Sequence, residues 1–105
     1  MKSSSKKIVF ITTTIKRKYM DQILSGIKTV EYKGYTDFWS TRINRVLHNP
    51  VYPDNCVINF LCGQKAYKYK ITKIELQVGP REIDGAKYDK YYEIHFEEMP
   101  EGQLL

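Results

Sequence analysis

The chain has few of the residues that mark several common protein classes. It contains only two cysteines, Cys56 and Cys62, and two histidines without the close spacing of a zinc site. Six residues apart on one extended strand, the two thiols would lie about 20 Å apart, too far for a disulfide. We therefore expect two buried, reduced thiols, no metal and no cofactor.

Long apolar runs are also missing. No stretch approaches the roughly 20 apolar residues of a membrane-spanning helix, and the apolar stretch 8–11 is too short for the core of a signal peptide. These absences, together with reduced cysteines, indicate a cytoplasmic protein that does not act at a membrane.

What is present fits one small globular domain. The 105 residues are 42% hydrophobic and 28% charged, which is ordinary composition. We predict a single domain over residues 1–105, with loose ends at 1–6 and 98–105. Charge is distributed unevenly, because residues 1–52 carry ten Lys and Arg against three acids. A basic half suggests an anionic partner, and nucleic acid is the first candidate, although a solvated surface explains the same charge.

Hydrophobic periodicity and turn residues predict an α+β fold. Strands are expected at 7–13, 29–32, 56–62, 66–77 and 90–96, with helices at 16–25 and 37–47, a loop at 48–55, and a polar connection at 81–89 after Gly79-Pro80. Two early helices and later hairpin-like connections favour a small, partly closed, mostly antiparallel β-barrel of about five to six strands, with both helices in the N-terminal half.

The segment from Gly26 to Lys33 carries the most information about function. In an alternating strand, Glu31 and Lys33 share one wall with Thr29, and Lys28 lies at the strand's mouth. The other face, Val30 and Tyr32, is predicted to point into the core. On residue chemistry alone a surface ion pair on a strand explains these charges better than a polar site does.

This segment resembles the signature of ASCH domains, a branch of the PUA-like superfamily, which is roughly Gly-x-Lys-x-x-Glu-x-Arg after a first helix. Gly26, Lys28 and Glu31 match, and Lys33 replaces the arginine. The order of elements agrees over residues 7–97. The resemblance implies a PUA-like barrel with these positions lining a cleft that binds RNA or modified bases.

Other cations and aromatics are candidates for the same interface. Tyr32 and Trp39 have the phase of core residues, whereas Tyr35 and Phe38 are expected at the edge of a cleft. The three cations at 16–18 open the first helix, where their charge opposes the helix dipole. The full set of predicted nucleic-acid-binding residues is Lys16, Arg17, Lys18, Lys28, Glu31, Lys33, Tyr35, Phe38, Arg42, Arg45, Lys68 and Lys70. His95 is predicted to be an ordinary exposed histidine on a strand.

We therefore predict a module that binds RNA, another nucleic acid or a modified nucleoside. The alternative is an enzyme using Lys28 and Glu31, either a ribonuclease or an amidohydrolase acting on an acylated cytidine, which some ASCH proteins are. Those amidohydrolases have a threonine where this chain has Glu31, and they take a glutamate from a longer segment before the last strand, where this chain offers Glu82 or Asp84. A third possibility is a protein-binding regulatory module.

Overall fold

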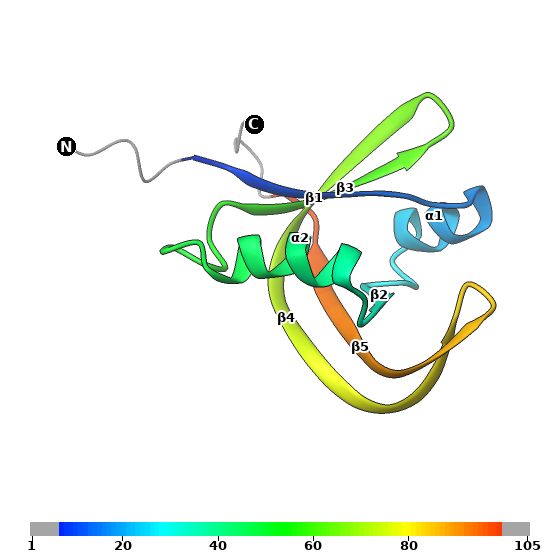
Figure 1. The fold of residues 1–105 in the computed structure, drawn as a ribbon. Helices are drawn as coiled ribbons and strands as arrows, with labels where there is room; N and C mark the ends of the chain where they lie inside the picture. Colours follow the sequence, from blue (N-terminus) through cyan, green and yellow to red (C-terminus); the bar gives the residue numbers. More distant parts are fainter. Residues whose placement is uncertain (1–6, 100–105) are drawn as a thin grey trace.

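The computed structural model describes residues 7–99 as a curled sheet with two helices (Figure 1). The elements are β1 (Val9–Thr14), α1 (Arg17–Leu24), β2 (Val30–Gly34), α2 (Asp37–Leu47), β3 (Cys56–Cys62), β4 (Lys65–Ile83) and β5 (Ala86–Glu97). The loose ends predicted at 1–6 and 98–105 fall outside this range, apart from residues 98 and 99. Neither helix of the described part is long and apolar enough to cross a membrane.

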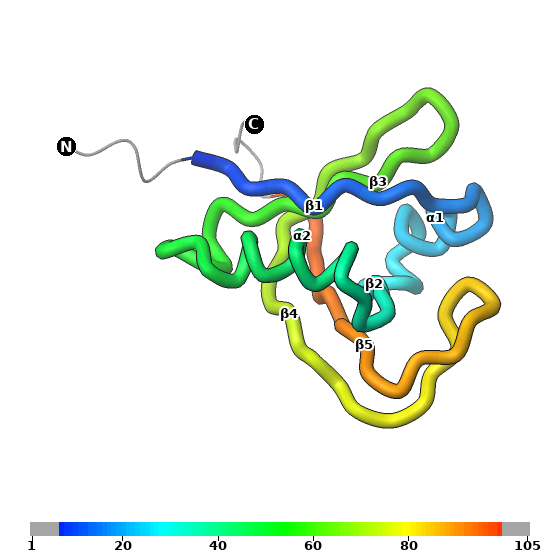
Figure 2. The backbone as a smooth tube through the Cα atoms, in the orientation of Figure 1, coloured from blue at the N-terminus to red at the C-terminus, as the bar shows by residue number. Residues whose placement is uncertain are grey.

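The five strands form one sheet in the order β1-β3-β4-β5-β2. Only the β1–β3 pair is parallel, and the other three ladders are antiparallel. The predicted α+β class is therefore confirmed, with a mostly antiparallel sheet and both helices in the N-terminal half. β1 and β2 are the two edges. The backbone trace shows that the sheet is strongly curled (Figure 2). A side-chain contact joins its two edges, because Lys33 on β2 donates a hydrogen bond of 2.7 Å to Thr13 Oγ1 on β1.

The helices follow from local sequence signals. α2 has the bounds predicted for it, because the Thr36 hydroxyl accepts a hydrogen bond of 3.2 Å from the Trp39 amide and caps its first turn. Asp37 in the first turn and Arg45 in the last complement the helix dipole. α1 ends before Gly26, whose φ of 85° is the left-handed conformation predicted for this position.

The core fills the inside of the curled sheet. α1 contributes Met20 and Ile23, and α2 contributes Ile43 and Val46. The strands contribute alternate residues, among them Ile11, Ile58, Phe60, Ile71, Ile94 and Phe96. Trp39 packs against this cluster as predicted. Cys56 and Cys62, at the two ends of β3, are buried and free, which confirms the prediction of reduced thiols.

The prediction of a polar connection at 81–89 is wrong. Gly79-Pro80 does not end the strand, because β4 continues to Ile83 and pairs with β5 on both sides of a register shift between Val78 and Arg81. This β-bulge, with Gly79 at a φ of 126°, bends the hairpin instead of terminating it. We call residues 79–89 the β4–β5 arm; it curves beneath β2 towards α1 (Figure 1).

The alternation along β2 is the reverse of the prediction. Residues that pair across strands share a face, and Glu31 lies opposite Ile94, which is fully buried in the core. Lys33 is on this inner face and is itself only 7% exposed. Val30 and Tyr32, expected in the core, lie on the other face. The polar side chains can point inward because each of them has a charged or hydrogen-bonding partner there.

Candidate binding pocket

A pocket of about 470 Å³ opens between the start of α1, β2 and the β4–β5 arm. Its volume falls within the range of about 300–1,000 Å³ that is typical of small-molecule sites. The lining residues come from four separate segments of the chain: Thr14, Ile15, Lys16, Tyr19, Lys28, Glu31, Tyr32, Lys33, Arg81, Glu82, Ile83 and Asp84.

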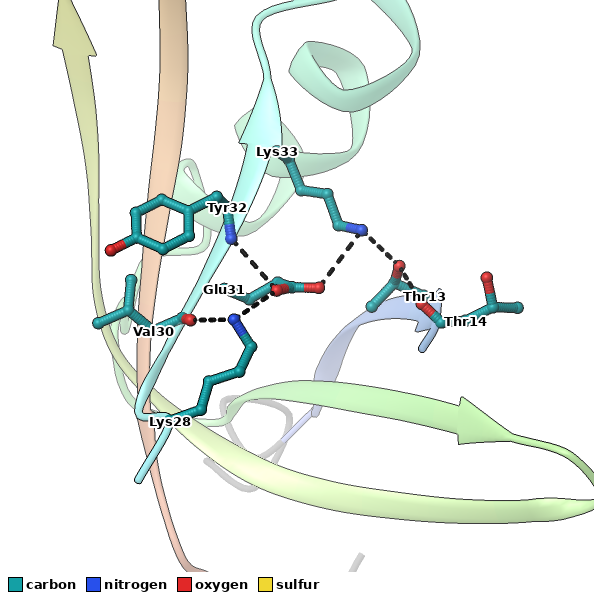
Figure 3. A network of polar contacts seen from close by, with 7 residues as sticks. All are labelled: Thr13, Thr14, Lys28, Val30, Glu31, Tyr32 and Lys33. Carbon is teal, nitrogen blue, oxygen red and sulfur yellow. Dashed lines mark hydrogen bonds and ion pairs between the residues drawn. The ribbon is translucent and has the colours of Figure 1, made fainter. Parts of the chain in front are cut away.

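Part of this lining is a connected polar network (Figure 3). The Glu31 carboxylate lies between two ammonium groups, with Oε1 3.1 Å from Lys28 Nζ and Oε2 3.5 Å from Lys33 Nζ. Lys28 also donates to the Val30 carbonyl at 2.7 Å, and Lys33 donates to Thr13 Oγ1 at the same distance. We call Lys28, Glu31, Lys33 and Thr13 the lysine–glutamate network.

Because the network is largely buried, the attraction between its charged groups is strong. The side chains of Lys28, Glu31 and Lys33 are 17%, 12% and 9% exposed, so water screens their charges weakly. One carboxylate balances two cations, which leaves a net positive charge. The Lys33 ammonium also lies 4.6 Å from the centre of the Trp39 ring, so it contacts Glu31, Thr13 and Trp39 at once. Lys28 makes two polar contacts with its three N–H groups, and its ammonium lies 5.5 Å from the centre of the Tyr32 ring.

An aromatic ring and a guanidinium form one wall of the pocket. The Arg81 guanidinium lies 3.7 Å from the centre of the Tyr32 ring, which is cation–π stacking at close range. Tyr91 packs against Tyr32 with 6.1 Å between ring centres, and the Arg81 guanidinium also lies 5.5 Å from the centre of the Tyr91 ring. The wall is therefore a preformed flat surface with a positive charge on it.

The β4–β5 arm also brings acidic groups to the pocket. Glu82 and Asp84 line it and are exposed. In total, the lining has four cationic side chains and three carboxylates, with the cations concentrated along β2 and at Lys16 and Arg81. The pocket thus has a positive interior and a partly acidic rim.

Four of the predicted site residues meet in this pocket: Lys16, Lys28, Glu31 and Lys33. The other two cations that open α1 do not line it. Arg17 forms an ion pair with Asp21 at 2.9 Å, within α1, and Lys18 Nζ lies 5.0 Å from the centre of the Tyr19 ring.

The predicted residues on and near α2 also lie outside the pocket lining. Arg42 stacks on Phe38 at 3.5 Å and donates to the Phe38 carbonyl at 2.9 Å, so its guanidinium is occupied locally. Tyr35 packs against Tyr92, with 5.6 Å between ring centres. Arg45 is on the exposed side of α2.

The two predicted binding residues on β4 are likewise separate from the pocket. Lys68 is exposed on β4 opposite Asn59 of β3. Lys70 lies 4.0 Å from the Asp54 carboxylate. Neither residue lines the pocket, so the structure does not join them to the lysine–glutamate network.

Sequence reasoning missed half of the pocket, chiefly the β4–β5 arm. Arg81 was placed in a connection, and Tyr32 was assigned to the core. The signal that was available is the Asp84-Gly85 pair between two β-rich segments, a strong local indication of a tight hairpin. Both residues have positive φ, 52° and 84°, as such a turn requires.

The chain was also compared with family models, with curated proteins and with solved structures, and it matches none of them. The functional assignment consequently depends on the pocket's own geometry and on the short motif around Lys28.

Proposed function

We propose that the protein binds nucleic acid, with RNA as the first candidate, or a modified nucleotide, in the pocket between α1, β2 and the β4–β5 arm. The observation that carries this proposal is the combination of a stacked Tyr32–Arg81 wall with the largely buried lysine–glutamate network. Single-stranded nucleic acids are recognised by stacking on flat side chains together with hydrogen bonds to base edges.

In this proposal each part of the pocket has a separate role. A base stacks along the Tyr32–Arg81 wall, and the Lys28 ammonium donates to a base carbonyl. Glu31 retains acceptor capacity for an exocyclic amine, because a carboxylate offers about four lone-pair positions. Lys16 and Arg81 contact the backbone phosphates. The Gly26–Lys33 resemblance to ASCH domains supports the same location for the ligand.

Substitution of Lys28 tests the proposal. Lys28→Ala is expected to weaken binding of short single-stranded RNA about tenfold or more, because it removes a charge and a donor inside the pocket. Fluorescence anisotropy at low and moderate salt measures this. Lys87→Ala removes the same charge from an exposed position of β5 outside the pocket lining and is the matched control. Equal losses in the two variants would reject the pocket as the binding site.

An amidohydrolase is the second candidate, since the arm carries Glu82 and Asp84 into the same pocket as Lys28. A carboxylate there could activate water for attack on an N-acyl carbon, releasing the carboxylic acid and returning a proton to the cytidine amine. Release of acetate from N4-acetylcytidine, lost in Glu82→Gln or Asp84→Asn, would establish this activity. Hydrolysis that survives in both variants would exclude these residues as the base.

A further inference from the structure

A second cluster of functional groups lies on the outer face of the β4–β5 ladder, away from the core. Glu93 and His95 flank the fully buried Ile94 and so point to the opposite side of the sheet. Glu75 on β4 pairs directly with Glu93. The chelating atoms of Glu75, Glu93 and His95 all lie within 4.8 Å of one another.

Two carboxylates opposite each other on neighbouring strands repel, which destabilises an antiparallel pair. Lys73 offsets this repulsion only in part, because its ammonium lies 3.7 Å from Glu75 Oε2 and its side chain is 56% exposed. The other oxygen of Glu75 and the Glu93 carboxylate face the imidazole instead. The arrangement therefore has room for a further positive charge between them.

The imidazole geometry indicates what supplies that charge. His95 Nε2 is buried and has no hydrogen-bond partner among residues 7–99, the part that the structure describes. It lies 3.6 Å from Glu75 Oε1 and 3.5 Å from Glu93 Oε1, longer than a good hydrogen bond. Neighbouring ligands of a tetrahedral metal with bonds of about 2.0–2.1 Å are about 3.3–3.4 Å apart. The two distances from the imidazole to the carboxylates are thus close to the spacing expected for ligands of one ion.

We propose that Glu75, Glu93 and His95 bind a divalent transition-metal ion, with Zn²⁺ as the first candidate. Imidazole favours such ions over Ca²⁺ and Mg²⁺, and two carboxylates neutralise the charge of the ion. Gln77 Nε2 donates to Glu93 Oε1 at 3.2 Å and holds this carboxylate in place. Three protein ligands leave a fourth position for water, which is the pattern of an open site.

Isothermal titration of the folded protein with Zn²⁺ tests the proposal. Wild-type protein should bind one equivalent, and His95→Ala and Glu75→Gln should each bind at least tenfold more weakly. His48→Ala removes the sequence's other histidine, which is exposed at the end of α2, and should bind like wild type. Absence of binding to wild type at millimolar Zn²⁺, or a loss in His48→Ala equal to that in His95→Ala, would overturn the proposal.

Glu75→Gln also separates metal binding from a structural role. Without metal, this variant should unfold at the same or a higher urea concentration than wild type, because it removes the like-charge pair. With saturating Zn²⁺, only wild type should gain stability. If the variant gains as much as wild type, Glu75 is not a ligand and the proposed site is wrong.

Discussion

At the scale of single residues, Glu31 is the group on which its neighbours depend most. It is the counterion of both Lys28 and Lys33 in surroundings with little water. We expect Glu31→Gln to lower the free energy of unfolding by about 3–5 kcal/mol, because it leaves two largely buried cations without a counterion. Urea denaturation followed by circular dichroism measures the loss. Glu97→Gln, at an exposed position of β5, is the control, and a similar loss there would contradict the argument.

Cys56 makes stability depend on pH in the alkaline range. Burial raises the pKa of its thiol above the ordinary value of 9.0. Above pH 9 the unfolded chain therefore holds fewer protons than the folded protein. The contribution of the protonated thiol to the free energy of unfolding is fully present below pH 9 and is lost as the pH rises through the folded-state pKa. Burial likewise raises the pKa of Tyr69 from 10.0, so the test is confined to lower pH.

The measurement is the urea midpoint at a series of pH values from neutral to pH 10. We expect Cys56→Ala to have a shallower decline above pH 9 than wild type, although the variant is less stable at neutral pH because of the cavity. A decline as steep as that of wild type would show that another group causes the alkaline instability.

At the scale of elements, the β4–β5 arm forms one side of the pocket without contributing to the core. Each of the described core residues lies outside residues 79–89. Tyr88 of the arm covers Gly34 so closely that a Cβ there would overlap its ring, which explains why the arm stays against β2.

We therefore expect the arm to be removable. If residues 79–89 are replaced with Asn-Gly, a tight two-residue turn connects Val78 to Lys90, its partner in the β4–β5 register. The shortened protein should keep its circular dichroism spectrum and cooperative unfolding but lose RNA binding, since Arg81 and its stacking wall are gone. Binding that persists at wild-type affinity would place the ligand elsewhere.

Some elements could be predicted from local sequence signals alone, and others could not. α2 was predicted with correct bounds because its cap, dipole charges and apolar stripe are all local. The continuation of β4 into the arm was not predicted, because Gly79 and Pro80 are equally compatible with a strand end and with a bulge. Only pairing with β5 decides between these two conformations. The inward direction of Glu31 was missed for a similar reason, since only the pairing of β2 with β5 places Glu31 opposite the buried Ile94.

At the scale of the whole molecule, the positive charge predicts a moderate dependence of binding on salt. The net charge is +5, and the proposed binding mode has two phosphate contacts, from Lys16 and Arg81. Release of about 0.7 counterion per phosphate of a single strand gives a slope of about −1.4 for log K against log salt concentration. Lys16→Ala should reduce this slope. A slope near zero would indicate a ligand that is not held by phosphates.

Long-range strand pairing also determines which of the two candidate sites could be predicted from the sequence. Gly26, Lys28 and Glu31 were found because they form one continuous motif. The Glu75–Glu93–His95 cluster was not, since its members are brought together only by the β4–β5 register. His95 was accordingly predicted to be an unremarkable exposed residue, whereas its Nε2 atom is buried.

The parallel pairing of β1 with β3 has a consequence for the order of events in folding. β4 and β5 are joined by two residues and can pair within microseconds, whereas β1 must find β3 across the whole segment that contains α1, β2 and α2. The first strand of the chain is therefore expected to be among the last to dock. Because Lys33 binds Thr13 on that strand, the lysine–glutamate network is completed only at this late step. A nascent or partly folded chain would accordingly lack the complete network until its N-terminal strand has paired with β3.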